Sequence, residues 1–162
     1  MKKNLFIASM MLVALCFAAC SQTNNPTEPE TPDTPTITPP LEESDYVDLG
    51  LPNHIKWGKR NEDMGDWNYA YKKSIPTRDD FIDLLNNCKW EWGGTGFTIT
   101  GPNGNSIWLP TEGSTSAVKS GYYWIAGEGK PAYFYFNSKL EYRFESSSSY
   151  SSWINSVRLV ER

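Results

Sequence analysis

Two residue types that carry much enzyme chemistry are scarce in this sequence. Its 162 residues include one histidine, His54, and three cysteines, Cys16, Cys20 and Cys88. A nucleophile of the Ser–His or Cys–His kind needs a nearby histidine, and a structural zinc site needs several His and Cys ligands. His54 follows a Pro-Asn turn, a position typical of surface packing. We therefore expect no enzyme activity, no catalytic residues, no cofactor and no metal site.

Clusters of basic residues and long apolar runs are also lacking. The formal net charge is −4 at pH 7, and lysines and arginines are scattered along the chain. Because nucleic-acid binding depends on grouped cations, we expect no nucleic-acid partner. The main apolar run, residues 5–17, is shorter than the about 20 residues of a membrane-spanning helix.

The N-terminus is instead typical of a secretory signal. Two lysines, the apolar run and two alanines lead to Cys20. This order resembles the lipobox of bacterial lipoproteins, although Phe17 stands where leucine is usual. The resemblance implies that residues 1–20 are the signal and that Cys20 is acylated. Acylation would anchor the protein to the outer membrane, since several acyl chains hold a protein durably at a membrane. Ordinary cleavage near Ala19 is the alternative.

A spacer and one domain follow the signal. Residues 21–44 are rich in Pro, Thr and acids and nearly free of large apolar groups, a composition that favours an extended, disordered linker. Residues 45–162 have the length of one domain and hold all seven tryptophans and all nine tyrosines. An acidic cluster often follows the cysteine in surface-exported lipoproteins, but here the first acid after the signal is Glu28. A surface-exposed and a periplasmic position therefore both stay open.

One helix is expected in this domain. Thr77 is a suitable N-cap, and Asp79 and Asp80 suit the positive end of the helix dipole. Apolar side chains follow at helical spacing, at Phe81, Leu84, Leu85 and Cys88. The pattern predicts a helix from Arg78 to about Asn87, with Cys88 on its buried side.

The rest of the domain predicts short strands. An Asn103-Gly104 turn separates residues 97–100 from 106–109, which indicates a hairpin. In residues 132–136 two phenylalanines alternate with two tyrosines, so one face of that strand is expected to be deeply buried and the other shallower. Further strands are expected at 46–49, 54–57, 122–125, 132–136, 140–144 and 156–160. One helix against mostly antiparallel strands is an α+β domain.

An ordered series of motifs gives the domain a resemblance. The motifs are YVDLGLP from Tyr46, IKW from Ile55, GDW from Gly65, IPT from Ile75, GPNGNSI from Gly101, GYYW from Gly121 and VRLV from Val157. Together they resemble the Fibrobacter succinogenes major paralogous domain, which is abundant in secreted and lipid-anchored proteins of the Bacteroidetes. The resemblance covers residues 46–162.

The resemblance implies a fold and sets a limit on function. That family is similar to the compact C-type-lectin-like fold in its formylglycine-generating-enzyme variant, in which the first and last strands pair. Residues 157–160 would then pair near residues 46–49. Only three residues separate Tyr71 from Ile75, whereas relatives usually carry a long insertion there. Formylglycine-generating enzymes need two active-site cysteines, so Cys88 alone does not carry that activity over.

Four residues are candidates for ligand binding. Trp92 shares a strand face with Trp90, and Tyr150, Trp153 and Asn155 lie in the serine-rich stretch 146–155. Tyr, Trp, Ser and Asn are the residues with which binding loops often contact ligands. The alternatives are core packing for the tryptophans and a plain connecting loop for 146–155.

These observations favour a cell-envelope lipoprotein that presents a C-type-lectin-like binding or adhesion module. Its ligand, a glycan or a protein, stays open, as does its oligomeric state. The alternative is a structural or accessory subunit of a surface appendage or envelope complex, and a degenerate enzyme-like domain is the weakest interpretation.

Overall fold

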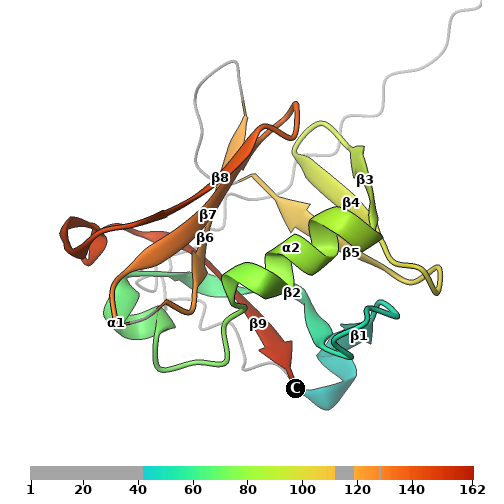
Figure 1. Cartoon of the computed structure of the whole chain (residues 1–162), viewed down its shortest axis with the longest axis horizontal. Helices are drawn as coiled ribbons and strands as arrows, with labels where there is room; N and C mark the ends of the chain where they lie inside the picture. Colours follow the sequence, from blue (N-terminus) through green and yellow to red (C-terminus); the bar gives the residue numbers. More distant parts are fainter. Residues whose placement is uncertain (1–41, 112–118, 128) are drawn as a thin grey trace, which may run out of the picture. The chain divides into compact units, whose positions relative to one another are not determined.

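The described chain consists mainly of two open β-sheets, with loops and helices between their strands (Figure 1). The structure, a computed structural model, describes residues 42–111, 119–127 and 129–162, so the expected signal, Cys20 and most of the linker lie outside the described residues. One sheet has six strands in the order β1-β2-β9-β6-β7-β8, and the other has the order β3-β4-β5. With two α-helices added, the domain is α+β, as predicted.

The elements have the following bounds. The strands are β1 Tyr46–Asp48, β2 Lys56–Gly65, β3 Lys89–Trp92, β4 Gly96–Thr100, β5 Ser106–Pro110, β6 Ser120–Ile125, β7 Ala132–Asn137, β8 Tyr142–Ser146 and β9 Asn155–Glu161. The helices are α1 Trp67–Ala70 and α2 Arg78–Asn87, with single 3₁₀ turns η1 Glu43–Asp45 and η2 Ser148–Tyr150. Within the described ranges, no helix combines the length and the apolar character needed to cross a membrane.

Helix α2 begins and ends where the sequence predicts. The Thr77 hydroxyl accepts a hydrogen bond from the Asp80 backbone N–H (3.2 Å), and the Asp80 carboxylate accepts one from the Thr77 N–H (2.7 Å). This reciprocal capping box satisfies two amide groups that the helix itself leaves unbonded. Arg162 donates to the same carboxylate (2.6 Å) and so ties the residue after β9 to the start of α2.

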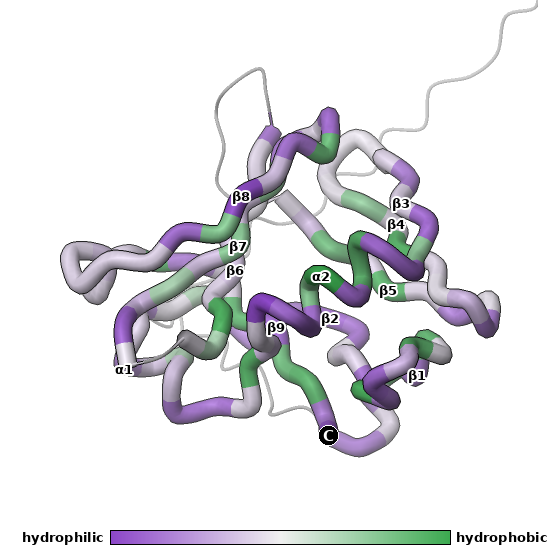
Figure 2. The backbone as a smooth tube through the Cα atoms, in the orientation of Figure 1, coloured by the Kyte–Doolittle hydropathy of each residue, from purple (hydrophilic) through white to green (hydrophobic). Residues whose placement is uncertain are grey.

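Strand alternation divides the six-stranded sheet into two differently packed faces. Phe134 and Phe136 of β7 face α2 and the three-stranded sheet, where Phe81 of α2 stacks on Phe134 with ring centroids 4.3 Å apart. Figure 2 shows hydrophobic residues along α2 and the neighbouring strands. Tyr133 and Tyr135 point to the opposite face and pack with a second cluster that contains Trp124. The predicted division of this strand into two faces is therefore confirmed.

The pairing of the terminal strands differs from the expectation. β9 pairs with β2, as in Trp57↔Val160, and β1 pairs with the other edge of β2, as in Val47↔Trp57. The first and last strands are therefore separated by β2, because β2 continues to Gly65 and offers two edges. β9 also pairs with β6 in the parallel direction, at Tyr123↔Ser156, so the sheet is not wholly antiparallel.

The predicted hairpin is present, and its turn has a structural role. β4 and β5 pair through five residues, and the side-chain amides of Asn103 and Asn105 both donate to the Asp48 carbonyl oxygen at 2.9 Å. A Cβ atom on Gly101 would lie 2.1 Å from the Leu49 carbonyl oxygen, closer than atoms can approach. The GPNGN segment thus docks on the end of β1 and needs glycine to do so.

A buried arginine joins the two sheets. The register of β2 and β9 shifts between Trp57 and Asn61, and Arg158 of β9 lies in this region with 0% exposure. Its guanidinium donates to the Gly58 carbonyl oxygen of β2 (2.6 Å) and to the Trp108 carbonyl oxygen of β5 (2.7 Å). Arg158 therefore supplies donors where the β2–β9 ladder is irregular and where the second sheet approaches.

Replacing Arg158 tests this role. In Arg158→Met both carbonyl oxygens lose this donor, and each buried group left unsatisfied costs about 1–3 kcal/mol. We expect the free energy of unfolding, measured by urea denaturation, to fall by about 2–5 kcal/mol. The exposed Arg78 is the matched control, since Arg78→Met removes a surface cation and should change stability by less than about 1 kcal/mol. Equal losses in both variants would contradict the assignment.

Candidate functional site

The face of the six-stranded sheet opposite α2 carries a group of aromatic and charged side chains. We call this group the aromatic face, and it consists of Tyr122, Tyr133, Tyr135, Arg143, Glu145, Tyr150 and Trp153. Strands β6, β7 and β8 contribute five of these residues, and the segment around η2 contributes the other two. Each strand residue reaches this face because its neighbours in sequence point toward the core under α2.

Cross-strand pairing orders the strand residues of the aromatic face. Tyr122 lies opposite Tyr135, which lies opposite Arg143, and the two tyrosine rings are 5.1 Å apart at their centroids. The Arg143 guanidinium carbon lies 4.0 Å from the Tyr135 ring centroid. In the next row Tyr133 lies opposite Glu145. Directly opposed side chains of this kind stabilise each other, so the sheet itself holds the row in place.

The Glu145 carboxylate is the polar centre of the aromatic face. One oxygen accepts hydrogen bonds from the hydroxyls of Tyr133 (2.7 Å) and Tyr150 (3.0 Å), and the other lies 2.5 Å from Nε of Arg143. The hydrogen bond from Tyr133 lowers the pKa of Glu145, with further contributions from Tyr150 and Arg143. Burial, followed by the bond to Glu145, raises the pKa of Tyr133. Glu145 is therefore ionised and Tyr133 protonated at neutral pH.

The serine-rich stretch between β8 and β9 is an ordered part of the aromatic face. The Ser147 hydroxyl accepts a hydrogen bond from the Ser149 backbone N–H, and the Trp153 backbone N–H donates one to the Tyr150 carbonyl oxygen (2.9 Å). The segment therefore folds into η2 and a turn. The Tyr150 and Trp153 rings are 4.5 Å apart at their centroids, and Trp153 stacks on Tyr133 at 5.8 Å. Trp153 remains 43% exposed, while Tyr133 beneath it is 2% exposed.

The four predicted ligand residues separate into two groups. Tyr150 and Trp153 come together on the aromatic face. Asn155 is the first residue of β9 and only 4% exposed, so the structure corrects the expectation that its side chain is offered on the loop surface. Trp92 is 36% exposed, but it lies at the end of β3 and packs edge-on against Phe97 of the neighbouring strand β4, in the three-stranded sheet. It is not part of the aromatic face.

Sequence reasoning missed the strand residues of the aromatic face. Arg143 and Glu145 are two apart in one strand, and Tyr133 and Tyr135 are two apart in the preceding one. Period-two spacing in neighbouring strands is the signal that would have placed these four side chains on one face. The structure is needed for their register, which places Tyr133 opposite Glu145 and Tyr135 opposite Arg143.

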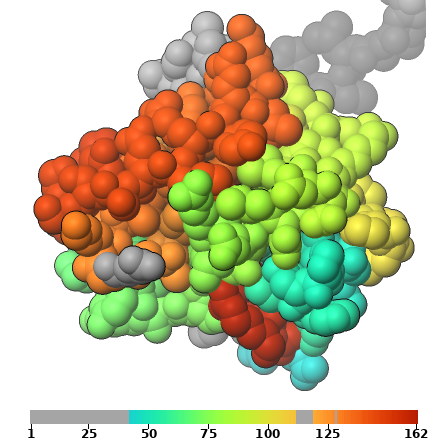
Figure 3. Space-filling model, in the orientation of Figure 1, coloured from blue at the N-terminus to red at the C-terminus, as the bar shows by residue number. Residues whose placement is uncertain are grey.

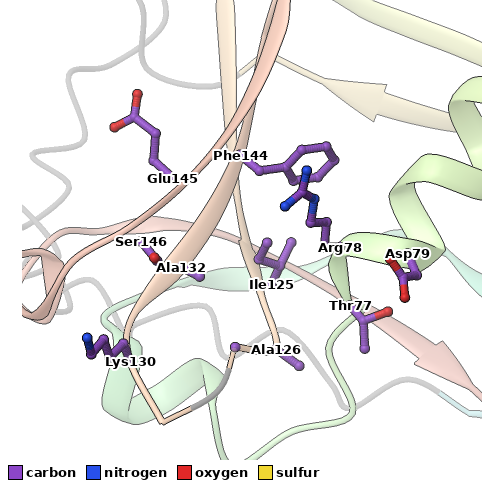
Figure 4. A pocket seen from close by; sticks show the side chains of 11 residues that line it. Thr77, Arg78, Asp79, Ile125, Ala126, Lys130, Ala132, Phe144, Glu145 and Ser146 are labelled. Atoms are coloured by element: carbon purple, nitrogen blue, oxygen red, sulfur yellow. The ribbon is translucent and has the colours of Figure 1, made fainter.

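A cleft lies on the other side of β8, next to α2. It has a volume of about 780 Å³ between the first residues of α2 and the ends of β6, β7 and β8 (Figure 4). Figure 3 shows α2 at the surface beside the residues of β7 and β8. The cleft is lined by Thr77, Arg78, Asp79, Ile125, Ala126, Gly127, Lys130, Ala132, Phe144, Glu145 and Ser146.

Charged residues of both signs line this cleft. Arg78 and Lys130 contribute two cations, and Asp79 and Glu145 contribute two carboxylates. The Arg78 guanidinium carbon lies 5.2 Å from the Phe144 ring centroid, and in Figure 4 the Glu145 carboxylate points away from this pair. The cleft thus presents mixed charges beside a partly covered aromatic ring.

The residues considered for catalysis lie outside the cleft. His54 is exposed in the turn before β2, with a positive φ of 57°. Cys88 ends α2, and burial, with a smaller effect of Asp83, raises the pKa of its thiol to about 11. A thiol with that pKa is protonated at neutral pH and is a poor nucleophile. Within residues 42–111, 119–127 and 129–162, no three His, Cys, Asp or Glu residues are grouped to hold a metal ion.

The hydrogen bond from Tyr133 to Glu145 gives a pH-dependent prediction. A carboxyl group whose pKa is lower in the folded than in the unfolded protein stabilises the fold at pH values above its pKa in the unfolded protein. That stabilisation is lost as the pH falls through its pKa in the folded protein. In Tyr133→Phe we expect the folded pKa of Glu145 to rise toward its ordinary value of 4.5, as measured by NMR titration of the carboxyl carbon. The stability that depends on Glu145 should then be lost at a higher pH.

Tyr142→Phe is the control for this titration. It also removes one hydroxyl from the same sheet, but Tyr142 is 52% exposed and its ring packs near Phe134 and Phe144 on the opposite face. The pKa of Glu145 should not change in this variant. If Tyr133→Phe leaves that pKa unchanged as well, the hydrogen-bond assignment is wrong.

Comparison of the chain with models of protein families gives no match, and comparisons with curated proteins and with solved structures give none either. The resemblance to the Fibrobacter succinogenes major paralogous domain therefore stays a prediction from the sequence motifs.

Proposed function

We propose that this protein is a non-catalytic lipoprotein of the cell envelope, anchored in the outer membrane through Cys20, whose C-type-lectin-like domain binds a ligand with the aromatic face. The single observation that carries this proposal is the aromatic face itself. Trp153 and Tyr150 are held over Tyr133 beside an exposed Arg143–Glu145 ion pair.

The aromatic face is ordered before any ligand arrives. The hydroxyls of Tyr133 and Tyr150 both donate to Glu145, which fixes their rings, and Trp153 rests on Tyr133. Rigid rings with few rotatable bonds lose little conformational entropy on binding, so preorganisation of this kind favours affinity. A core aromatic cluster would be covered, whereas Trp153 is 43% exposed.

The lectin-like fold is supported by the motif series and by several features of the domain. The segment GPNGN, which the resemblance singles out, docks on the end of β1, and the helix begins at the predicted Thr77 cap. The last strand returns to the sheet that also contains the first strand. These features are compatible with a compact lectin-like domain, with β2 lying between its first and last strands.

The alternative function is that of an accessory subunit in a surface appendage or envelope complex. One observation favours it. β8 is the last strand of the described six-stranded sheet, and its Tyr142 is 52% exposed. An edge strand has backbone groups with which a strand of another protein can pair.

Binding through the aromatic face is testable on arrays of glycans and envelope proteins. We expect the full chain to bind at least one array component, and Trp153→Ala to weaken that binding at least tenfold because the exposed ring is lost. Trp92→Ala is the matched control, since Trp92 is comparably exposed but lies on the other sheet. If both variants bind like the unchanged protein, the aromatic face is not the binding surface.

The lipid anchor gives a separate prediction. Each acyl methylene buried in a membrane contributes about 0.8 kcal/mol, so loss of the acylated residue should release the protein. In Cys20→Ser we expect no incorporation of labelled palmitate and a shift of the chain from the membrane to the soluble fraction. Cys88→Ser is the control and should remain acylated and membrane-bound. Acylation that persists in Cys20→Ser would refute the assignment.

A further inference from the structure

We propose that the ligand of the aromatic face is an uncharged carbohydrate chain, which stacks on Trp153 and hydrogen-bonds to the Arg143–Glu145 pair. This inference rests on the proposed function of the same face and adds the chemical class of the ligand. Three properties of the face carry it, namely the presentation of its rings, its charge and its size.

The rings present an apolar surface with polar groups at its edge. The Trp153 indole stacks on Tyr133, with the ring planes 27° apart, and Tyr150 lies against it with the ring centroids 4.5 Å apart, yet Trp153 remains 43% exposed. An aromatic ring has a negative face that attracts polarised C–H groups, and a sugar ring presents such groups on its flat sides. Stacking of a sugar on Trp153 would therefore be favourable and would not require the indole to move.

The charged groups suit a ligand with hydroxyls and no net charge. Arg143 and Glu145 neutralise each other, and their side chains are 51% and 35% exposed. The remaining guanidinium N–H groups are donors, and the carboxylate is an acceptor beside them. A hydroxyl group both donates and accepts, so neighbouring sugar hydroxyls can bond to both partners at once. An anionic or cationic ligand would be attracted by one member of the pair and repelled by the other, so the pair gives a charged ligand no net electrostatic advantage.

The size of the exposed aromatic area favours a few sugar units over a protein. A tryptophan side chain presents up to about 250 Å², so Trp153 at 43% exposure offers roughly 100 Å². Tyr122, Tyr135 and Tyr150 are each less exposed than Trp153. Together with Trp153 they supply only part of the about 800 Å² that each partner contributes to a typical protein–protein interface, so a protein ligand would need many further contacts outside these rings.

Most of the turn that presents the rings is polar, although the neighbouring Ile154 is apolar and 58% exposed. Serines are dense in the turn that presents Tyr150 and Trp153, at Ser147, Ser148, Ser149, Ser151 and Ser152, and all but one are exposed. Their hydroxyls offer further hydrogen bonds to a chain that extends beyond Trp153. A protein interface centred here would instead need apolar contacts around the anchor rings.

The test measures binding of the full chain to defined polysaccharides by affinity electrophoresis. The probes are neutral β-glucan, xylan and mannan, the acidic polygalacturonate, and an array of envelope proteins. We expect retardation by at least one neutral polysaccharide and at least tenfold weaker binding in Trp153→Ala and in Arg143→Ala. Trp153→Tyr should retain part of the binding, because it keeps an aromatic ring. Trp108→Ala, which removes a comparably exposed ring from β5, should bind like the unchanged protein.

The remaining outcomes separate this inference from the proposed function. Binding only to polygalacturonate, or equal binding of neutral polysaccharide by the unchanged protein and Trp153→Ala, would overturn the inference. If a protein on the array is the only ligand and Trp153→Ala loses it, the ligand class is wrong while the binding function of the face stands. If no probe binds in any way that depends on the aromatic face, both proposals fail. Thermal unfolding of each variant identifies any loss of binding that results from unfolding.

Discussion

The buried guanidinium of Arg158 is the interaction on which the arrangement of the two sheets depends. It donates to a carbonyl oxygen of β2, where the β2–β9 register shifts, and to a carbonyl oxygen of β5 in the other sheet. Burying a charge is costly unless hydrogen bonds compensate. The cost is met here because one planar group reaches carbonyls of two sheets at once. β9 itself lies inside the large sheet, where it pairs with β2 and β6, and β7 and β8 follow beyond β6.

Beyond β9, strand alternation separates the residues that fill the core under α2 from those that support the aromatic face. Phe134 and Phe136 fill the core under α2, whereas Tyr133 and Tyr135 of the same strand support the aromatic face. The rings of the aromatic face have a rigid base because the sheet beneath them is packed on its other side. Tyr150 and Trp153 lie between β8 and β9, but they rest on Tyr133 of β7, so a strand fixes their position from below.

Residues that a sequence pattern brings to notice are not always those at the surface. The GPNGN segment is prominent in the sequence, and its amides hold the end of β1. Asn155, chosen for its polar character, is buried in β9, whereas Glu145, which no motif marks, receives two tyrosine hydroxyls and Arg143. Short segments report local needs such as turns and caps, but they do not report which side chains meet across strands.

The amino-acid sequence by itself determined the local elements of this domain. The cap at Thr77, the extent of α2, the β4–β5 hairpin and the alternation in β7 follow from interactions within a few residues. Only the tertiary structure decided that β2 separates β1 from β9, that β9 runs parallel to β6, and that Trp153 stacks on Tyr133. The physical reason is that these contacts join segments up to about a hundred residues apart, and their register depends on the packing of the whole core.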